Sequence, residues 1–139
     1  MRILGIDYGD ARTGIAITDA LNITVQGLET IHNKGSDKII LKRLDEILKQ
    51  YEVDTIVIGK PINMNGTKSE RTEITEKFIH KIKCKYNKLK IETVDERLTT
   101  VAAHKTMNFL DVGKNKKRNI VDTISAVYIL ETYLNKIKK

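Results

Sequence analysis

The chain has 139 residues, of which 40% are hydrophobic and 31% are charged. This balance is typical of a globular protein with one domain over residues 1–139, and it excludes an intrinsically disordered chain. No apolar run approaches the roughly 20 residues that span a bilayer, and the N-terminus does not resemble a signal peptide. We therefore expect a cytoplasmic protein without a membrane partner. Since Cys84 is the only cysteine, the sequence excludes an internal disulfide and a cysteine-based zinc site.

Positive charge is concentrated in a few segments of the chain. The formal net charge is +7, and lysines and arginines gather in segments 81–90, 114–118 and 136–139. Such clusters favour polyanionic partners, nucleic acid first. A solvated lysine-rich surface without a partner is the alternative interpretation.

The first 18 residues predict two buried strands joined by a tight turn. The apolar runs Ile3–Ile6 and Ile15–Ile17 are short, rich in branched side chains and bounded by glycine. Asp7 ends the first run, and an acid at the end of a core strand is costly unless something binds it. Gly9 would let a phosphate or a metal-bound oxygen approach the backbone. The alternative is that Asp7 is an ordinary turn aspartate.

Strands and helices alternate in the rest of the chain. This order predicts an α/β fold with a mixed central five-stranded sheet flanked by helices. The predicted elements are a weak strand over 23–30, an amphipathic helix with apolar positions from Ile40 to Tyr51, a strand over Thr55–Ile58, a helix over 69–86, a strand over Lys90–Val94, a short helix from Thr99 to about Leu110, a basic loop over Val112–Arg118 and a last helix over Ile120–Ile137.

Three acids that are distant in sequence converge in this topology. Asp7 and Glu96 follow strands of one sheet, and Asp122 lies near the start of a helix that packs on it. Clustered carboxylates repel one another, and a divalent cation relieves that repulsion. Oxygen ligands suit Mg²⁺ or Mn²⁺, and such sites hydrolyse phosphodiesters. The alternative is that Glu96 and Asp122 are surface acids, paired with Arg97 or Lys117.

Four motifs in order resemble those of the bacterial YqgF/RuvX family, described as pre-16S rRNA nucleases or Holliday junction resolvases. The resemblance covers essentially the whole chain. It implies an RNase H-like fold of the RuvC type and a metal-dependent nuclease that processes the 5′ end of the small-subunit ribosomal RNA precursor, with junction resolution as the older assignment. The motifs are Asp7-Tyr-Gly with Arg12-x-Gly14, Gly59-Lys-Pro-Ile-Asn-Met-Asn-Gly66, Asp95-Glu-Arg-Leu-Thr-Thr100 and Lys117-x-x-x-x-Asp122-x-x-x-Ala126.

The resemblance also implies roles for individual residues. Asp7, Glu96 and Asp122 become the catalytic acids and the ligands of Mg²⁺ or Mn²⁺. One departure is Gly59-Lys-Pro, where the family usually has Gly-Leu-Pro, which places Lys60 near the crevice. The expected contacts to structured RNA, or to branched DNA, are Gly9, Arg12, Lys60, Asn63, Arg97, Thr99, Thr100, Lys114, Lys116, Lys117 and Arg118.

Two neighbouring acids compete for the inward position at the end of the last predicted strand. If Ile91 faces the core, strict alternation puts Asp95 on the core face and Glu96 outward. The resemblance favours Glu96. We expect Glu96 to be the ligand because the strand is predicted to end near Val94, after which alternation no longer fixes direction.

Three other functions remain open from the sequence. The chain could resolve branched DNA, or it could bind nucleic acid without catalysis, with purely structural acids. An ATP-binding domain of the actin and sugar-kinase type shares the early Asp-x-Gly turn, but such proteins need two lobes and this chain is short for them.

Overall fold

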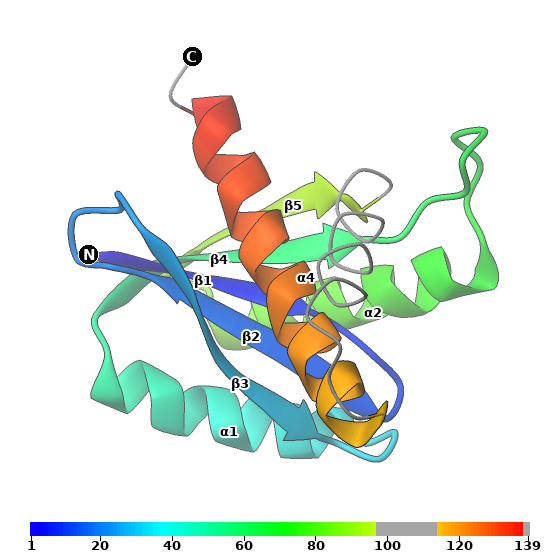
Figure 1. The fold of residues 1–139 in the computed structure, drawn as a ribbon, viewed down its shortest axis with the longest axis horizontal. Coiled ribbons are helices and arrows are strands. Elements are labelled where there is room, and N and C mark those ends of the chain that lie inside the picture. Colours follow the sequence, from blue (N-terminus) through cyan, green and yellow to red (C-terminus); the bar gives the residue numbers. More distant parts are fainter. Residues whose placement is uncertain (97–113, 138–139) are drawn as a thin grey trace.

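The computed structural model describes residues 1–96 and 114–137, and it describes side chains for 1–96 and 122–137. Figure 1 shows a single sheet crossed by one long helix. The sheet has five strands in the order β3-β2-β1-β4-β5. Strands β1, β4 and β5 are parallel, and β2 is antiparallel to β1 and β3. The strands are β1 (Arg2–Asp7), β2 (Arg12–Thr18), β3 (Val25–His32), β4 (Val53–Lys60) and β5 (Lys90–Asp95).

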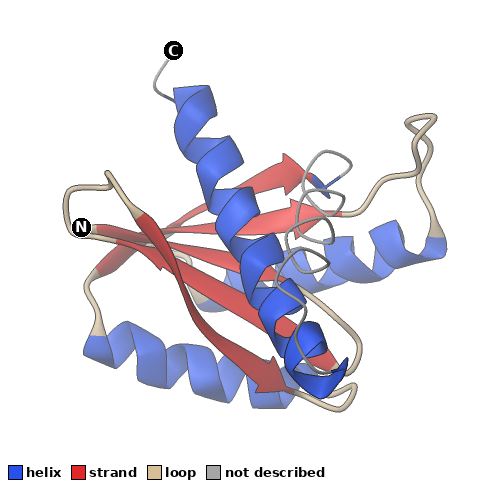
Figure 2. Ribbon diagram, in the orientation of Figure 1, coloured by secondary structure: helices blue, strands red, loops and turns tan. Residues whose placement is uncertain are grey.

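Helices cover both faces of the sheet. Helices α1 (Asp37–Gln50) and α2 (Glu70–Lys85) lie on one face, and α4 (Lys114–Ile137) crosses the other (Figure 2). Because both faces are covered, β1, β2 and β4 read as continuous apolar runs rather than as alternating strands. The predicted α/β class with a mixed five-stranded sheet is therefore confirmed.

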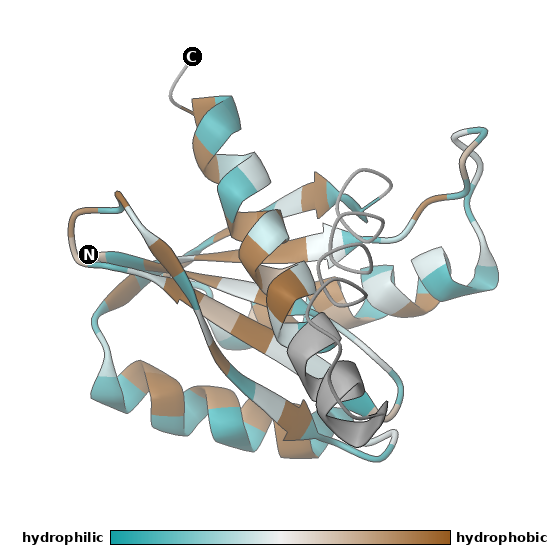
Figure 3. Cartoon of the chain, in the orientation of Figure 1, coloured by the Kyte–Doolittle hydropathy of each residue, from teal (hydrophilic) through white to brown (hydrophobic). Residues whose placement is uncertain are grey.

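Alternate residues of the strands belong to two separate cores, and Figure 3 shows brown, hydrophobic residues on the helix faces that meet the sheet. In β1, Leu4 and Ile6 pack against α1 and α2, whereas Ile3 packs against α4. Helices α1 and α2 contribute Ile40, Leu44, Ile47, Phe78, Ile79 and Ile82 to the first core, and α4 contributes Ala126, Ile129, Leu130, Tyr133 and Leu134 to the second.

Helix α4 approaches the backbone of the sheet closely because glycines face it. A Cβ added at Gly14 of β2 would lie 2.0 Å from the carbonyl oxygen of Asp122, and one at Gly27 of β3 would lie 2.0 Å from Cγ2 of Thr123. No real Cβ fits at such a distance. The glycines therefore fix where α4 crosses the strands, and so where Asp122 lies.

Several element boundaries differ from the prediction, and two of the differences bear on the site and its surroundings. Strand β3 begins at Val25, because Asp19 Oδ1 accepts hydrogen bonds from the amides of Ile23 and Thr24 and holds them in the turn. The predicted basic loop is wrong for Lys114–Arg118, which form the first turns of α4. After Gly113 the sequence contains no glycine or proline to interrupt a helix. The predicted short helix from Thr99 to Leu110 lies outside the described residues.

None of the helices within residues 1–96 and 114–137 combines the length and the apolarity that a membrane span requires.

Candidate active site

Asp7 and Glu96 meet at the carboxyl edge of the parallel strands, on the face that α4 covers. Asp7 ends β1 and follows Ile3 and Gly5 on that face, and Glu96 follows Val94 of β5 on the same face. The side chains of Asp7 and Glu96 are hydrogen-bonded to each other. A hydrogen bond between two carboxyl groups needs one proton between them.

The environment of Asp7 opposes its ionisation. Burial is the largest cause, followed by the hydrogen bond to Glu96 and the negative charges of Glu96 and Asp122, and together they hold the pKa of Asp7 well above its ordinary value. The charge of Arg71 acts in the opposite direction. Asp122 therefore lies within electrostatic reach of Asp7, so the structure brings two of the predicted acids into contact and places the third nearby.

Glycines on both sides of Asp7 make room for the other two acids. Asp7 pairs with Gly14 of β2, against which the backbone of Asp122 lies. Ile6 pairs with Ile58 of β4, so Gly59 follows at the same edge of the sheet. A Cβ added at Gly59 would lie 2.6 Å from Cγ and Oε1 of Glu96. The Glu96 side chain thus occupies space that any other residue at position 59 would fill.

Arg12 holds the third acid. Its Nε donates to Asp122 Oδ2 at 2.9 Å, and the two side chains are 31% and 18% exposed. We predicted Arg12 as a contact to the substrate, and the structure places it beside the acids as the partner of Asp122. Among the described residues, no three His, Cys, Asp or Glu side chains already form a metal-binding cluster.

The turn after Asp7 is fixed by side chains from several elements. Asn33 Nδ2 donates to the carbonyl oxygens of Gly9 and Asp10 at 3.1 and 2.9 Å, and the amide of Gly9 donates to Thr13 Oγ1 at 3.3 Å. A Cβ added at Gly9 would lie 2.0 Å from the carbonyl oxygen of Arg12. Gly9, another predicted contact, therefore allows the turn to close tightly beside Asp7.

Sequence reasoning missed Arg71, which holds the same turn from α2. Its Nη2 donates to the carbonyl oxygen of Tyr8 at 2.5 Å, and its Nη1 pairs with Asp10 Oδ1 at 2.6 Å. The guanidinium carbon lies 5.0 Å from the centroid of the Tyr8 ring, and that ring stacks on Phe78. The available signal was an arginine in the first turn of a helix, where the helix dipole disfavours a cation.

Of the other predicted contacts, only Lys60 and Asn63 have side chains that the structure describes, and neither lies beside the acids. Lys60 lies on the α2 side of the sheet, where its Nζ pairs with Glu76 at 3.0 Å. Asn63 donates to Thr67 Oγ1 at 3.0 Å within its own exposed loop. Lys114, Lys116, Lys117 and Arg118 lie in the first turns of α4, and their side chains are not among those described. Arg97, Thr99 and Thr100 lie outside the described residues.

Known proteins resemble this chain along nearly its whole length. Residues 1–136 match the family described as "RuvX: Holliday junction resolvase". A protein of Ruminiclostridium cellulolyticum named "Putative pre-16S rRNA nuclease" is 58% identical over 137 residues, which are 99% of this chain and 96% of that protein. A protein of the same name from Acetivibrio thermocellus is 47% identical over 135 residues, which are 97% and 96% of the two chains.

Solved structures share the fold. RuvC of Thermus thermophilus superposes with a TM-score of 0.56 at 7% identity, covering 99% of this chain and 97% of its own. The same protein in complex with a Holliday junction substrate gives 0.57 at 9% identity, covering 99% and 96%. These likenesses confirm the predicted RNase H-like fold of the RuvC type.

Proposed function

The chain belongs to the RuvX family, and from this premise we propose that it is a metal-dependent endonuclease that processes the 5′ end of pre-16S ribosomal RNA. The observation that carries the proposal is the carboxyl pair of Asp7 and Glu96, with Asp122 in electrostatic reach. A pair of partly buried acids in contact is costly to keep in a fold without a use. Relatives at 58% and 47% identity carry the name of a pre-16S rRNA nuclease, which favours RNA as the substrate.

The donor set fits a hard divalent cation. Asp7, Glu96 and Asp122 offer only carboxylate oxygens, which suit Mg²⁺ or Mn²⁺. These three residues would hold the ion. When bound, such an ion lowers the pKa of water and stabilises the leaving oxygen of a phosphodiester.

The remaining residues position the acids and the substrate. Burial and the charges of Glu96 and Asp122 raise the pKa of Asp7, and a bound cation would relieve that repulsion. Arg12 keeps Asp122 beside the strands. Arg71 and Asn33 fix the turn that follows Asp7. The cations of Lys114–Arg118 at the start of α4 would bind phosphates without reading bases.

Holliday junction resolution is the second candidate, because the family description names it. A cleavage assay with Mn²⁺ compares a pre-16S RNA fragment that spans the 5′ processing site with a four-way DNA junction of the same total length. We expect cleavage of the RNA at one position and little cleavage of the junction. Junction cleavage with intact RNA would make the chain a resolvase. No cleavage of either, with tight binding of both, would make it a binding module.

A further inference from the structure

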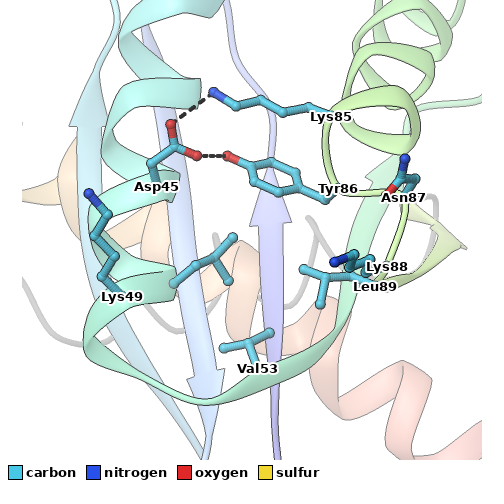
Figure 4. A pocket seen from close by; sticks show the side chains of 9 residues that line it. Asp45, Lys49, Val53, Lys85, Tyr86, Asn87, Lys88 and Leu89 are labelled. Atoms are coloured by element: carbon cyan, nitrogen blue, oxygen red, sulfur yellow. Dashed lines mark hydrogen bonds and ion pairs between the residues drawn. The ribbon is translucent and has the colours of Figure 1, made fainter.

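A cavity separate from the acids lies between the ends of α1 and α2. Its volume is about 510 Å³, which is within the range of ligand-binding pockets. Its lining residues come from the last turns of both helices, from the start of β4 and from the segment between α2 and β5, as Figure 4 shows. They are Asp45, Leu48, Lys49, Val53, Lys85, Tyr86, Asn87, Lys88 and Leu89.

The cavity is at the opposite end of the sheet from the acids. Val53, which lines it, pairs with Arg2 at the start of β1, whereas Asp7 ends that strand. Five residue steps along a strand separate the two places by roughly 17 Å. The helices that form the cavity also cover the other face of the sheet. A ligand here would therefore not occupy the candidate active site.

The cavity combines an aliphatic floor with a positive rim. Leu48, Val53 and Leu89 provide apolar surface without hydrogen-bonding groups. Three lysines and one aspartate give the lining a formal net charge of +2. Asp45 is already neutralised, because its two oxygens bind Lys85 Nζ at 2.9 Å and the hydroxyl of Tyr86 at 2.7 Å.

Two of the lysines are available to a ligand. Lys49 and Lys88 form no direct ion pair with another residue that the structure describes, and Lys49 acts on Asp45 only at longer range. Figure 4 shows them on opposite sides of the cavity, Lys49 from α1 and Lys88 from the segment before β5, so their ammonium groups do not converge on one point. This spacing suits separate negative charges along an extended chain better than a single phosphate.

We propose that this cavity binds a short acidic segment of a partner protein, with one apolar side chain on the floor and carboxylates at Lys49 and Lys88. The floor favours a side chain over a nucleic-acid base, because a base would leave its polar edges unpaired against Leu48, Val53 and Leu89. Base stacking needs an open aromatic face. Tyr86, the aromatic residue of the lining, has its hydroxyl bound to Asp45 and the ammonium of Lys85 at 5.7 Å from its ring centroid.

The test uses synthetic peptides and ¹⁵N-labelled full-length protein. The probe is a hexapeptide of glutamates with one central leucine or phenylalanine, and a second peptide has glycine at the centre. Amide chemical shifts report binding to the wild type and to the double variant Lys49→Glu/Lys88→Glu. The matched control is Lys38→Glu/Lys42→Glu, which makes the same charge change on exposed positions of α1 outside the cavity.

We expect the apolar-centred peptide to shift the amides of residues 48–53 and 86–89. Affinity should fall roughly tenfold or more in the cavity variant, because two ion pairs are lost and two repulsive charges are introduced. In the control variant the affinity should stay at the wild-type value. Equal binding of the glycine-centred peptide would overturn the proposal, because charge alone would then explain the affinity. Tighter binding of an oligouridylate at the same amides would overturn it in favour of nucleic acid.

Discussion

Gly14 lies against the carbonyl oxygen of Asp122, which occupies the position where a side chain at residue 14 would begin. A Cβ added there would be 2.0 Å from that oxygen and 2.4 Å from the carbonyl carbon. Because Gly14 also pairs with Asp7 in the sheet, one glycine sets the relative position of two of the three acids.

The substitution Gly14→Ala should therefore displace α4. We expect the free energy of unfolding to fall by about 1–3 kcal/mol, as for other overpacked sites, and urea denaturation followed by circular dichroism measures it. Gly27→Ala is the matched control, since there the added Cβ meets Cγ2 of Thr123, a side chain that can be shortened. Thr123→Ser should rescue Gly27→Ala, and no side-chain change in α4 should rescue Gly14→Ala. Wild-type stability of Gly14→Ala would contradict the close crossing.

The raised pKa of Asp7 predicts how stability depends on pH in metal-free buffer. A carboxyl group whose pKa is higher in the fold than in the unfolded chain contributes fully below the unfolded value, near 3.9, and its contribution is lost as pH rises through the folded value. The variant Asp7→Asn has no carboxyl group to ionise at this position, so its free energy of unfolding does not fall with pH for this reason. Thermal melts in EDTA from pH 4 to 8 should show the variant gaining stability over the wild type as pH increases. A difference that does not change with pH would contradict the environment assigned to Asp7.

Arg71 should act as a positioning residue for the turn that follows Asp7. Arg71→Ala should lower kcat roughly 10- to 100-fold, as is typical when a residue that orients metal ligands is lost, with little change in KM. Arg71→Lys should restore little activity, because one ammonium cannot hold both Tyr8 and Asp10 as the guanidinium does. The control is Arg43→Ala, which removes ion pairs to Glu29 and Glu46. If Arg71→Ala keeps both the wild-type kcat and the wild-type stability, the positioning role of Arg71 is contradicted.

The lysines at the start of α4 should bind RNA phosphates. Cations in the first turn of a helix oppose its dipole, so they are unfavourable for the helix alone. The triple variant Lys114→Gln/Lys116→Gln/Lys117→Gln should flatten the logarithmic salt dependence of RNA binding by about two units, at roughly 0.7 per charge for single strands. Lys38→Gln/Lys42→Gln/Lys77→Gln, exposed on the other face, makes the same charge change and should keep the wild-type slope. Equal slopes in the two variants would count against this contact.

The sequence predicted the sheet, and it singled out the three acids as candidates but not the contacts that hold them. Short apolar runs with glycines were sufficient for β1, β2 and β4, because strands buried on both faces have that composition. Gly14 and Gly59 were visible in the sequence, but their contacts with Asp122 and Glu96 depend on where α4 and β5 lie in space. Arg71 lies 64 residues after Asp7, so its contacts with the turn are equally tertiary.

At Asp95 and Glu96 the alternation of the strand held, but it was wrong to take the face opposite Ile91 as solvent. Alternation continues through β5: Ile91 packs with the first core and Val94 with the second. Glu96 therefore does face away from Ile91, as alternation predicts. That direction is not solvent, because α4 covers the second face, and Asp7 lies there as well. The choice of Glu96 agrees with its hydrogen bond to Asp7, although β5 extends to Asp95 rather than ending near Val94.

The central claim is that Glu96, and not its neighbour, completes a metal-dependent site with Asp7. The most direct measurement compares Asp95→Asn with Glu96→Gln, two variants that each remove one negative charge from adjacent positions on opposite faces of the sheet. Mn²⁺ affinity by calorimetry and cleavage of the pre-16S RNA fragment are measured for both. We predict that Glu96→Gln loses both metal binding and cleavage while Asp95→Asn retains them. Loss of both in Asp95→Asn, with a mild effect in Glu96→Gln, would contradict the site described for this chain.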